Sequence, residues 1–341
     1  MPTITHRTVH TNGINMHIAE AGEGPLVIMC HGWPESWYSW RHQLNALADA
    51  GFHAVAPDQR GYGQTDKPEA IDQYTQLHLT GDIIGLMDAL GEETAVIAGH
   101  DWGGPVAWNT ALFRPDRIRA VIGLSVPYLP RASTAQPAGR GAATMDWGGA
   151  TRPTDSMRAA FGDRFFYQLY FQAPGVAEHE FQRDVRRTMR LTLFNAGGEG
   201  VMKAAARAFA GEALPNTAFF LDSMTEPETL PEWLSEADLD FYTAEFEKAG
   251  FRGGVNWYRN IDRNWELSAV YAGSKIVQPA LFITGDLDVV YLSMARAAVD
   301  NLEASVPNLR KKVILPGCGH WTQQERAKEV NEEMIAFIKG L

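Results

Sequence analysis

A short segment around one acid, Gly99–Gly104, which reads Gly-His-Asp-Trp-Gly-Gly, constrains the fold of this chain most strongly. The apolar residues 94–98 before it are typical of a buried strand, and residues 105–113 after it resemble a helix with proline in its first turn. Small residues on both sides of Asp101 allow the backbone to reverse sharply and lift that side chain clear of the sheet. We therefore predict a strand–turn–helix elbow that presents a nucleophile, with aspartate in place of the usual serine. The alternative is that Asp101 only caps the following helix.

Charge and cysteine content restrict the partners and the compartment that we expect. The 341 residues carry a formal net charge of -11, which argues against nucleic acid and anionic membranes as partners. Two cysteines, Cys30 and Cys318, are too few for a disulfide framework and indicate a reducing environment. The first residues lack the apolar core of a signal peptide, and no apolar stretch is long enough to span a bilayer. We predict a cytoplasmic globular protein, and no sequence feature calls for a metal, nucleotide or redox cofactor.

Strands that alternate with helices indicate a mostly parallel sheet covered on both faces. Residues 8–18 are typical of a hairpin that turns at Asn12-Gly13. Apolar residues recur at helical spacing in the segment 74–90, which predicts an amphipathic helix. The remaining elements expected in this half of the chain are strands at 25–30, 52–57, 94–98 and 118–124 and helices at 40–50 and 105–113.

The pattern changes after residue 129 and returns near residue 268. Residues 130–151 are rich in Ala, Gly, Pro and Thr without any period and predict a loop, whereas residues 154–267 have helical patterns only. Buried-strand patterns then return at 279–284 and 312–315, and a last helix is expected at 324–338. We therefore divide the chain into a first part of the sheet domain, an inserted helical lid and a second part of the sheet domain, at residues 1–129, 130–267 and 268–341.

Reactive side chains follow several of the predicted strands. Asp101 follows one strand, Asp288 follows the strand 279–284, and His320 follows the strand 312–315. A single histidine after a strand is usually structural, but three matched positions favour a triad. The order nucleophile, acid, base is that of the α/β-hydrolase fold, which we take as the fold class. Asp286 is the other carboxylate near the acid position.

An aspartate nucleophile restricts the chemistry. Attack of a carboxylate on an ester or amide would give an anhydride, whereas attack on a saturated carbon gives an ester that activated water can hydrolyse. The leaving group would be a halide or the oxygen of an epoxide. The backbone N–H groups of Trp33 and Trp102 are the expected oxyanion donors. An epoxide oxygen needs a donor that can protonate it, as tyrosine can, whereas a halide needs N–H donors and no proton. The lid has aromatic segments at 166–172 and 256–260, but such residues are more often lid core, so composition alone does not decide between the two leaving groups.

The motifs together resemble those of the soluble epoxide hydrolases over nearly the whole chain. The resemblance implies that Asp101 is the alkylated nucleophile, that His320 is the base and that Asp288 orients it. It also implies that Tyr167 and Tyr258 bind and protonate the epoxide oxygen. The loop 130–151 is longer than the resemblance leads us to expect. The segments that carry the resemblance are 31–40, 99–104, 167–175, 250–253, 256–260 and 319–322.

We predict from this an epoxide hydrolase that converts lipophilic epoxides to vicinal diols through an ester on Asp101, which water activated by His320 then hydrolyses. A small lipophilic epoxide and water are the expected partners, and an exposed face of the lid could support a homodimer. The alternatives are a haloalkane dehalogenase and a non-catalytic ligand receptor on the same fold. The residues expected to line the substrate pocket are His31, Pro34, Gln168, Phe171 and Trp257.

Overall fold

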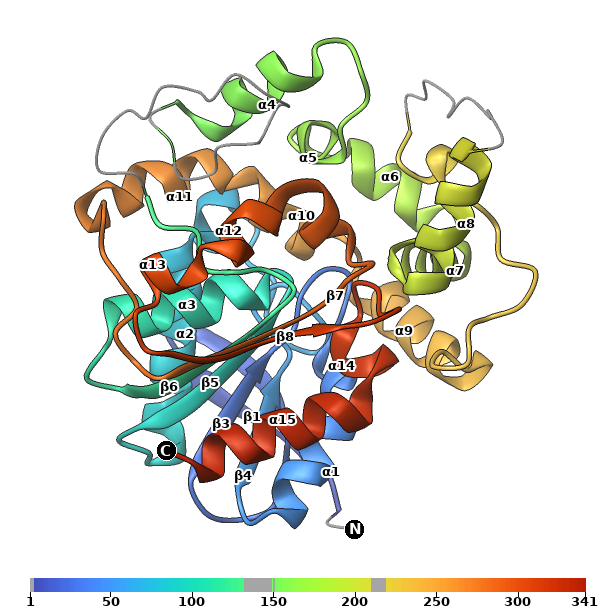
Figure 1. Ribbon diagram of the computed structural model, residues 1–341. Helices are drawn as coiled ribbons and strands as arrows, with labels where there is room; N and C mark the ends of the chain where they lie inside the picture. The colour runs from blue at the N-terminus through green and yellow to red at the C-terminus, as the bar shows by residue number, and fades with distance from the viewer. Residues whose placement is uncertain (1–2, 132–148, 150, 210–218) are drawn as a thin grey trace.

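The computed structural model describes residues 3–131, 149, 151–209 and 219–341. Within these residues, one eight-stranded sheet has the order β1-β2-β4-β3-β5-β6-β7-β8 (Figure 1). The first two strands and the β2–β4 pair are antiparallel, and all pairs from β4 to β8 are parallel. The strands are β1 (Thr5–Thr11), β2 (Ile14–Ala21), β3 (Leu26–Cys30), β4 (His53–Pro57), β5 (Ala95–His100), β6 (Ile118–Leu124), β7 (Ala280–Gly285) and β8 (Leu309–Leu315).

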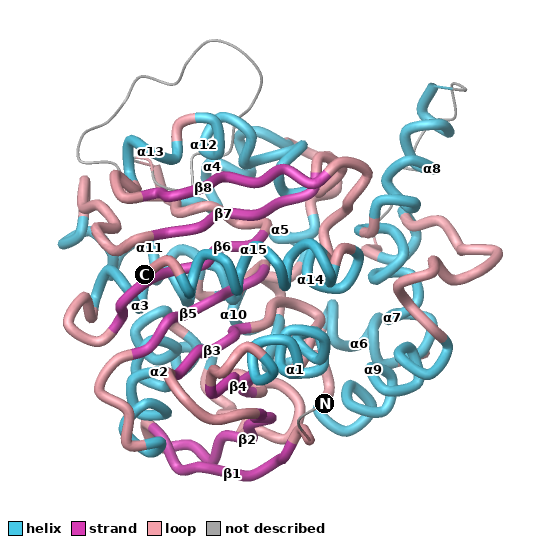
Figure 2. The backbone as a smooth tube through the Cα atoms, turned by 60° about the horizontal axis from the view of Figure 1, so that its bottom comes forward, coloured by secondary structure: helices cyan, strands magenta, loops and turns pink. Residues whose placement is uncertain are grey.

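Helices cover both faces of this sheet, as the alternating pattern predicted. Figure 2 shows α1 (Arg41–Asp49) and α15 (Ala327–Lys339) on one face, whereas α2 (Gln76–Leu90) and α3 (Gly103–Phe113) lie on the other. The central strands β3, β5 and β7 are buried along their whole length, because neither face of such a strand meets water. The predicted α/β-hydrolase fold with a mostly parallel sheet is confirmed.

The hairpin predicted at residues 8–18 is formed by β1 and β2. Asn12 and Gly13 occupy its turn with positive φ angles of 44° and 76°. A two-residue hairpin loop of this type needs left-handed backbone at both positions, and asparagine and glycine adopt it at low cost. Strand β2 then pairs with β4 and joins the hairpin to the parallel part of the sheet.

A helical cap is inserted between β6 and β7, above the carboxyl ends of the strands (Figure 1). This agrees with the helical pattern of residues 154–267, although the division of the chain at residues 129 and 267 stays a prediction. Most of the predicted loop 130–151 lies outside the described residues. The helices are α4 (Pro153–Phe161), α5 (Tyr167–Tyr170), α6 (Val176–Gln182), α7 (Val185–Ala196), α8 (Gly198–Phe209), α9 (Glu236–Ala249), α10 (Arg252–Arg259) and α11 (Ile261–Leu267).

The last part of the chain differs in detail from the prediction. The single helix expected at 324–338 is two helices, α14 (Thr322–Glu325) and α15, which are separated at Arg326 by a non-helical backbone. The carboxylate of Glu325 turns back onto the loop before α14 and accepts backbone hydrogen bonds there, which favours this break. Helices α12 (Arg296–Asp300) and α13 (Leu302–Ser305) between β7 and β8 were not predicted.

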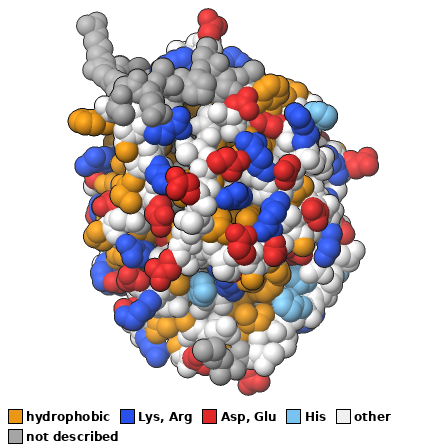
Figure 3. Space-filling model, turned by 90° about the vertical axis from the view of Figure 1, so that its right-hand side faces the viewer, with side chains coloured by type: hydrophobic (Ala, Val, Ile, Leu, Met, Phe, Trp, Pro, Cys, Tyr) orange, Lys and Arg blue, Asp and Glu red, His pale blue; other side chains and the backbone are white. Residues whose placement is uncertain are grey.

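The core consists of two apolar clusters, one on each face of the sheet. The larger joins β3, β5, α2 and α3 to the cap, and the smaller packs α1 and α15 against the other face. The outer face of the cap is charged: Figure 3 shows acidic and basic side chains interspersed there, and Arg186 of α7 pairs with Glu236 and Asp240 of α9. No helix of the described residues is long and apolar enough to cross a membrane.

Candidate active site

The predicted reactive side chains meet at the carboxyl ends of the parallel strands. Asp101 follows β5, Asp288 lies three residues after β7, and His320 lies five residues after β8. The loop that contains Trp33 follows β3, which is the neighbour of β5 in the sheet. Because these strands run in the same direction, their carboxyl ends share one edge, and that edge is where ligands bind in open α/β sheets.

The turn between β5 and α3 holds Asp101 in a left-handed conformation, with φ of 49°. Such a backbone is uncommon outside glycine and marks a strained elbow. A Cβ atom on Gly99 would overlap the carbonyl of Gly103, and one on Gly103 would overlap the carbonyl of Cys30, so both positions need glycine. The N-cap residue of α3 is Trp102, and no side-chain cap bond is formed at this helix end, so Asp101 does not occupy the N-cap position that the alternative gave it.

The two oxygens of the Asp101 carboxylate face different groups. Its Oδ1 accepts a hydrogen bond of 2.7 Å from the backbone N–H of Trp33, and the backbone N–H of Trp102 also bonds to this carboxylate. Its Oδ2 lies 3.6 Å from Nε2 of His320. The structure thus brings both predicted oxyanion donors to the predicted nucleophile.

A buried carboxylate orients His320 from the other side of its ring. Nδ1 of His320 lies 3.0 Å from Oδ1 of Asp288, and that carboxylate also accepts bonds from the backbone of Val290 and the hydroxyl of Thr284. Asp286 is instead exposed and accepts a bond of 2.7 Å from the backbone of Gly317. Of the two candidate acids, the structure places Asp288 beside the imidazole.

Sequence reasoning missed Ser125, which completes this arrangement. Its hydroxyl lies 3.1 Å from Nδ1 of His320, and its φ of 66° places it in the left-handed region. Ser125 directly follows β6, the strand that lies between β5 and β7 in the sheet. Its position at the carboxyl end of a strand is the signal that could have identified it.

The charges of this cluster shift the ionisation of its members. Burial alone would lower the pKa of His320, but the charge and hydrogen bond of Asp288, together with the charge of Asp101, raise it to about 9. Burial would raise the pKa of Asp288, but the charge and hydrogen bond of His320 keep it below its usual value. Burial raises the pKa of Asp101, opposed by the charges of His320 and His100.

A second buried ion pair, also missed, lies behind the nucleophile. Oε2 of Glu35 accepts a hydrogen bond of 2.8 Å from Nδ1 of His100 and another of 2.8 Å from the backbone of Gly32. Nε2 of His100 donates to the carbonyl of His320 at 2.7 Å. Both ring nitrogens of His100 therefore face acceptor oxygens, one of a carboxylate and one of a backbone carbonyl. Glu35 and His100 lie inside the motifs 31–40 and 99–104 that the sequence singled out, but neither motif signals their pairing.

The loop after β8 carries His320, and we call it the base loop. It is held by the cap as well as by the sheet. The backbone N–H of His320 donates to the carbonyl of Ala196 at 3.0 Å, and the indole of Trp321 donates to the carbonyl of Leu193 at 2.7 Å. Both acceptors belong to the last turn of α7, where the final helix carbonyls bind donors outside the helix. The orientation of His320 therefore depends on the position of the cap.

The cap brings both predicted tyrosines over Asp101. Tyr258 of α10 and Tyr167 of α5 have ring centroids 5.9 Å apart, and Tyr258 packs edge-on against the indole of Trp102 at 5.0 Å. The hydroxyl of Tyr167 accepts a bond of 2.9 Å from the amide of Gln168. Burial raises the pKa of both tyrosines, and the charge of Asp101 adds to this, so both hydroxyls are held in the protonated form.

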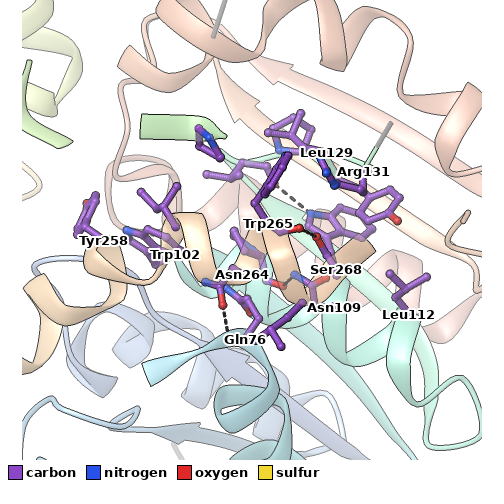
Figure 4. Close-up of a pocket in the computed structure, with 18 of the residues that line it drawn as sticks. Gln76, Trp102, Asn109, Leu112, Leu129, Arg131, Tyr258, Asn264, Trp265 and Ser268 are labelled. Carbon is purple, nitrogen blue, oxygen red and sulfur yellow. Dashed lines mark hydrogen bonds between the residues drawn. The ribbon is translucent and has the colours of Figure 1, made fainter. Parts of the chain in front are cut away.

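A cavity of about 200 Å³ runs from Asp101 between α3 and the cap helix α11 (Figure 4). Its wall is mostly aromatic and aliphatic, with Trp102, Tyr167 and Tyr258 near the acid, which is typical of a small-molecule site. Sequence reasoning missed most of the wall, because the residues come from seven separate segments of the chain. Besides those already named, the wall includes Gln76, Trp108, Asn109, Leu112, Val126, Tyr128, Leu129, Arg131, Ile261, Asn264, Trp265, Ser268 and Val290.

Only one of the five predicted pocket residues lines this cavity, namely Gln168. His31 is fully buried and bonds to the carbonyl of Gly32 and the backbone of Gln59, so its ring supports the loop after β3. Phe171 and Trp257 are buried behind the wall, where Phe171 packs on Tyr258 and the indole of Trp257 bonds to Arg60.

Pro34, the remaining predicted pocket residue, is also buried outside the cavity wall, and a cis peptide bond joins it to Trp33. Both cysteines, Cys30 and Cys318, are buried free thiols. In the part of the chain that the structure describes, no group of three or more His, Cys, Asp or Glu side chains could hold a metal ion.

The fold and this site define an α/β hydrolase whose elbow carries aspartate. A family model described as alpha/beta hydrolase fold matches residues 25–165. Epoxide hydrolase A of Mycobacterium tuberculosis is 46% identical over 339 residues, which are 99% of this chain and 98% of that protein. Epoxide hydrolase 3 of Siraitia grosvenorii is 42% identical over 342 residues, 99% of both chains.

Solved structures of epoxide hydrolases also match this chain over nearly its whole length. The crystal structure of Epoxide Hydrolase A from Mycobacterium thermoresistibile is 47% identical, with a TM-score of 0.88 over 99% of both chains. An epoxide hydrolase from an endophytic Streptomyces is 46% identical, with the same TM-score, and covers 99% of this chain and 96% of its own. The chain belongs to the epoxide hydrolases of the α/β-hydrolase fold, and the predicted family is confirmed.

Proposed function

We propose that this enzyme opens lipophilic epoxides to vicinal diols through a covalent ester on Asp101. The observation that carries the proposal is the pair of protonated cap tyrosines, Tyr167 and Tyr258, in the cavity that Asp101 also lines. Oδ1 of Asp101 accepts a bond from the backbone N–H of Trp33, whereas its Oδ2 lies 3.6 Å from Nε2 of His320. Such a site offers a nucleophile and acids on opposite sides of a bound three-membered ring. The mostly apolar wall of the cavity supports a lipophilic substituent on that ring.

In the first step, Oδ2 of Asp101 attacks one ring carbon from the side opposite the epoxide oxygen. The bond between that carbon and the epoxide oxygen breaks, and its electron pair stays on the oxygen. One tyrosine hydroxyl donates its proton to the developing alkoxide while the other donates a hydrogen bond. Oδ1 of Asp101 keeps its bond to the N–H group of Trp33, so it becomes the carbonyl oxygen of the ester.

In the second step, water attacks the Cγ atom of the ester on Asp101. Nε2 of His320 takes a proton from the water, and Asp288 stabilises the imidazolium that forms. The Trp33 and Trp102 amides are placed to hold the negative oxygen of the tetrahedral intermediate. The bond between Cγ and the alkyl oxygen then breaks, and that oxygen takes the proton from Nε2 of His320 as the diol leaves. The water oxygen remains on Asp101, and its remaining proton passes to the tyrosinate left by the first step, which restores the starting enzyme.

Formation of the ester also prepares the base. The charge of Asp101 is one of the causes that raise the pKa of His320. This charge disappears when the carboxylate is esterified, so the pKa of His320 falls at the stage when a neutral imidazole is needed. The contact between Oδ2 of Asp101 and Nε2 of His320 therefore supports an ionised nucleophile before the first step and a neutral base in the second.

The decisive experiment replaces both tyrosines, in Tyr167→Phe/Tyr258→Phe, and measures turnover of an aryl epoxide and of a haloalkane. We expect diol formation to fall by about 10²–10⁴-fold, because a positioned general acid contributes a factor of that size. The wild-type enzyme should release no halide, since the cap supplies proton donors for an alkoxide.

Tyr170→Phe is the matched control, because Tyr170 belongs to the same helix α5 but donates its hydroxyl to Glu180 at 2.8 Å and does not line the cavity. This variant should retain diol formation. Halide release that survives the double substitution would show a haloalkane dehalogenase instead. Tight binding of both compounds without turnover would show a ligand receptor.

We also propose a cytoplasmic location and a homodimer formed through the cap. The two free thiols support the first, because a reducing compartment keeps cysteines unpaired. Sedimentation of the purified protein at several concentrations would test the second.

A further inference from the structure

Four amide side chains line the otherwise mostly apolar cavity, and one of them, Gln168, donates to the hydroxyl of Tyr167 at the reacting end. The other three are Gln76 from α2, Asn109 from α3 and Asn264 from α11, and they line the cavity that also contains Asp101. Figure 4 shows these amides grouped beside the indole of Trp265, with the catalytic end of the cavity to one side. Polar groups in an otherwise apolar pocket fix the orientation of a ligand and determine specificity.

Two of the three amides are only partly engaged by the protein. Nδ2 of Asn109 donates to the carbonyl of Pro105 at 2.8 Å, and Oδ1 of Asn264 accepts from the backbone N–H of Gln76 at 2.8 Å. These contacts fix both side chains and leave the other atom of each amide for a further hydrogen bond.

The side chain of Gln76 has no hydrogen-bond partner among the described residues. It is 93% buried, with an exposed fraction of 7%, and its Oε1 is a buried acceptor without a donor. Buried polar atoms are nearly always paired, because an unpaired one loses its bonds to water without replacement. An unpaired amide in a cavity wall therefore indicates a group that a ligand would bond.

We propose that Gln76, Asn109 and Asn264 form a subsite for a hydroxyl group carried by the substrate on the side away from its epoxide ring. This inference rests on the proposed function. A hydroxyl both donates and accepts, so it satisfies an amide in either orientation. The three amides are neutral, which favours a neutral group over a carboxylate or an amine.

The charged residues of the cavity wall do not alter the preference for a neutral hydroxyl over a charged group. Asp101 belongs to the reacting end, and the guanidinium of Arg131 stacks on the ring of Trp265 at 3.7 Å and bonds to the carbonyl of Gly149. The preferred substrates are then epoxides with an apolar body, the oxirane at one end and a hydroxyl at a fixed separation from it.

A series of terminal 1,2-epoxyalkanes of increasing chain length tests this subsite. Each compound is compared with the analogue that carries a hydroxyl on its last carbon, and kcat/KM for diol formation is measured for both. The readout is the ratio of the two values within one enzyme, which does not depend on the fraction of active protein. The variants are Gln76→Met, which keeps the side-chain length and the backbone N–H bonded to Asn264, and Asn109→Leu.

At the chain length that fits best, we expect the hydroxyl-to-alkyl ratio to fall by about tenfold in Gln76→Met, as for the loss of one hydrogen bond. Asn109→Leu should lower the ratio at the same chain length. The control Gln73→Met replaces an exposed glutamine one turn earlier that does not line the cavity, and its ratio should equal that of the wild type.

Two results would overturn the proposal, and they have different meanings. If diols form but neither Gln76→Met nor Asn109→Leu changes the ratio at any chain length, the hydroxyl subsite does not exist and the proposed function stands. If the wild-type enzyme forms no diol from any compound in either series, the proposed function fails and the subsite fails with it.

Discussion

The protonation of single residues at this site is controlled by the charges around them. His320 lies between two carboxylates, with Asp288 at Nδ1 and Asp101 at Nε2, and its side chain is 5% exposed. Little solvent is present to screen these charges, so the protonated ring is stabilised relative to the neutral one. The same ring must lose its proton during the second step, and esterification of Asp101 makes that possible.

The raised pKa of His320 predicts a loss of stability at alkaline pH. The folded-state value is about 9 and the ordinary value is 6.5, so the contribution is complete below pH 6.5 and disappears as the pH rises through 9. We expect the free energy of unfolding to fall by about 3 kcal/mol between pH 6.5 and 9.5 from this group. Urea unfolding at the two pH values measures it.

Asp288→Asn is the informative variant for this prediction, because it removes the largest cause that raises the pKa of His320. The alkaline loss of stability should shrink in this variant. The alkaline loss of stability should persist in Asp286→Asn, because the wild-type Asp286 carboxylate is exposed and accepts a bond from Gly317 rather than from His320. An equal alkaline loss in both variants would contradict the assignment to His320.

Elements, and not only residues, are joined at the catalytic end of the sheet. The Glu35–His100 pair connects the loop after β3, the end of β5 and the base loop after β8 through the bonds to Gly32 and to the carbonyl of His320. Oε1 of Glu35 accepts two further bonds, from Gln323 and from Gln324 of α14. Three strand ends and one helix are therefore held by one buried carboxylate.

Replacement of the Glu35 carboxylate should destabilise the folded protein. In Glu35→Gln, His100 would lose its buried carboxylate partner, and the new amide N–H₂ would face other donors. We expect the free energy of unfolding to fall by about 3–5 kcal/mol, as for a broken buried ion pair. The exposed Glu23→Gln should lie within about 0.5 kcal/mol of the wild type in the same urea titration. A similar small effect of Glu35→Gln would disprove the linking role.

The elements themselves were largely predictable from sequence. Period and composition indicated the alternating strands, the elbow and the helical cap, because each signal lies within a short segment. The wall of the cavity was not predictable, since Asn109, Asn264 and Tyr128 come together only through packing of the cap on the sheet. His31 and Phe171 were assigned to the pocket from their motifs, but a motif does not show whether a side chain supports a wall or forms it.

At the scale of the whole molecule, the cap is fastened to the catalytic centre. The carboxylate of Glu325 accepts backbone hydrogen bonds from Gly198 of the cap at 3.1 Å and from Gly319 and Trp321 of the base loop at 2.9 and 3.0 Å. Together with the bond from Trp321 to Leu193, these contacts join α7, α8 and the loop that carries the base. We call this set of contacts the Glu325 latch.

Glu325→Gln should loosen the latch, because an amide N–H₂ cannot accept the bonds that a carboxylate oxygen accepted. We expect the free energy of unfolding to fall by about 1–3 kcal/mol. Hydrogen exchange should accelerate in the peptides that cover residues 193–200 and 317–321. Glu329→Gln, an exposed change four residues later, is the control. Unchanged exchange in both peptides of Glu325→Gln would show that the cap is held by other contacts.

The position of the cap in the chain also affects how the protein is made. Strand β6 ends at Leu124, and its neighbour β7 begins only at Ala280, after the whole cap has been synthesised. A growing chain therefore presents β6 as an open sheet edge while the cap leaves the ribosome, and exposed edges are sites of mispairing. The strand that leads to Asp101 emerges early, whereas His320 follows the last strand. The two halves of the catalytic centre meet only when the final pairing closes the sheet.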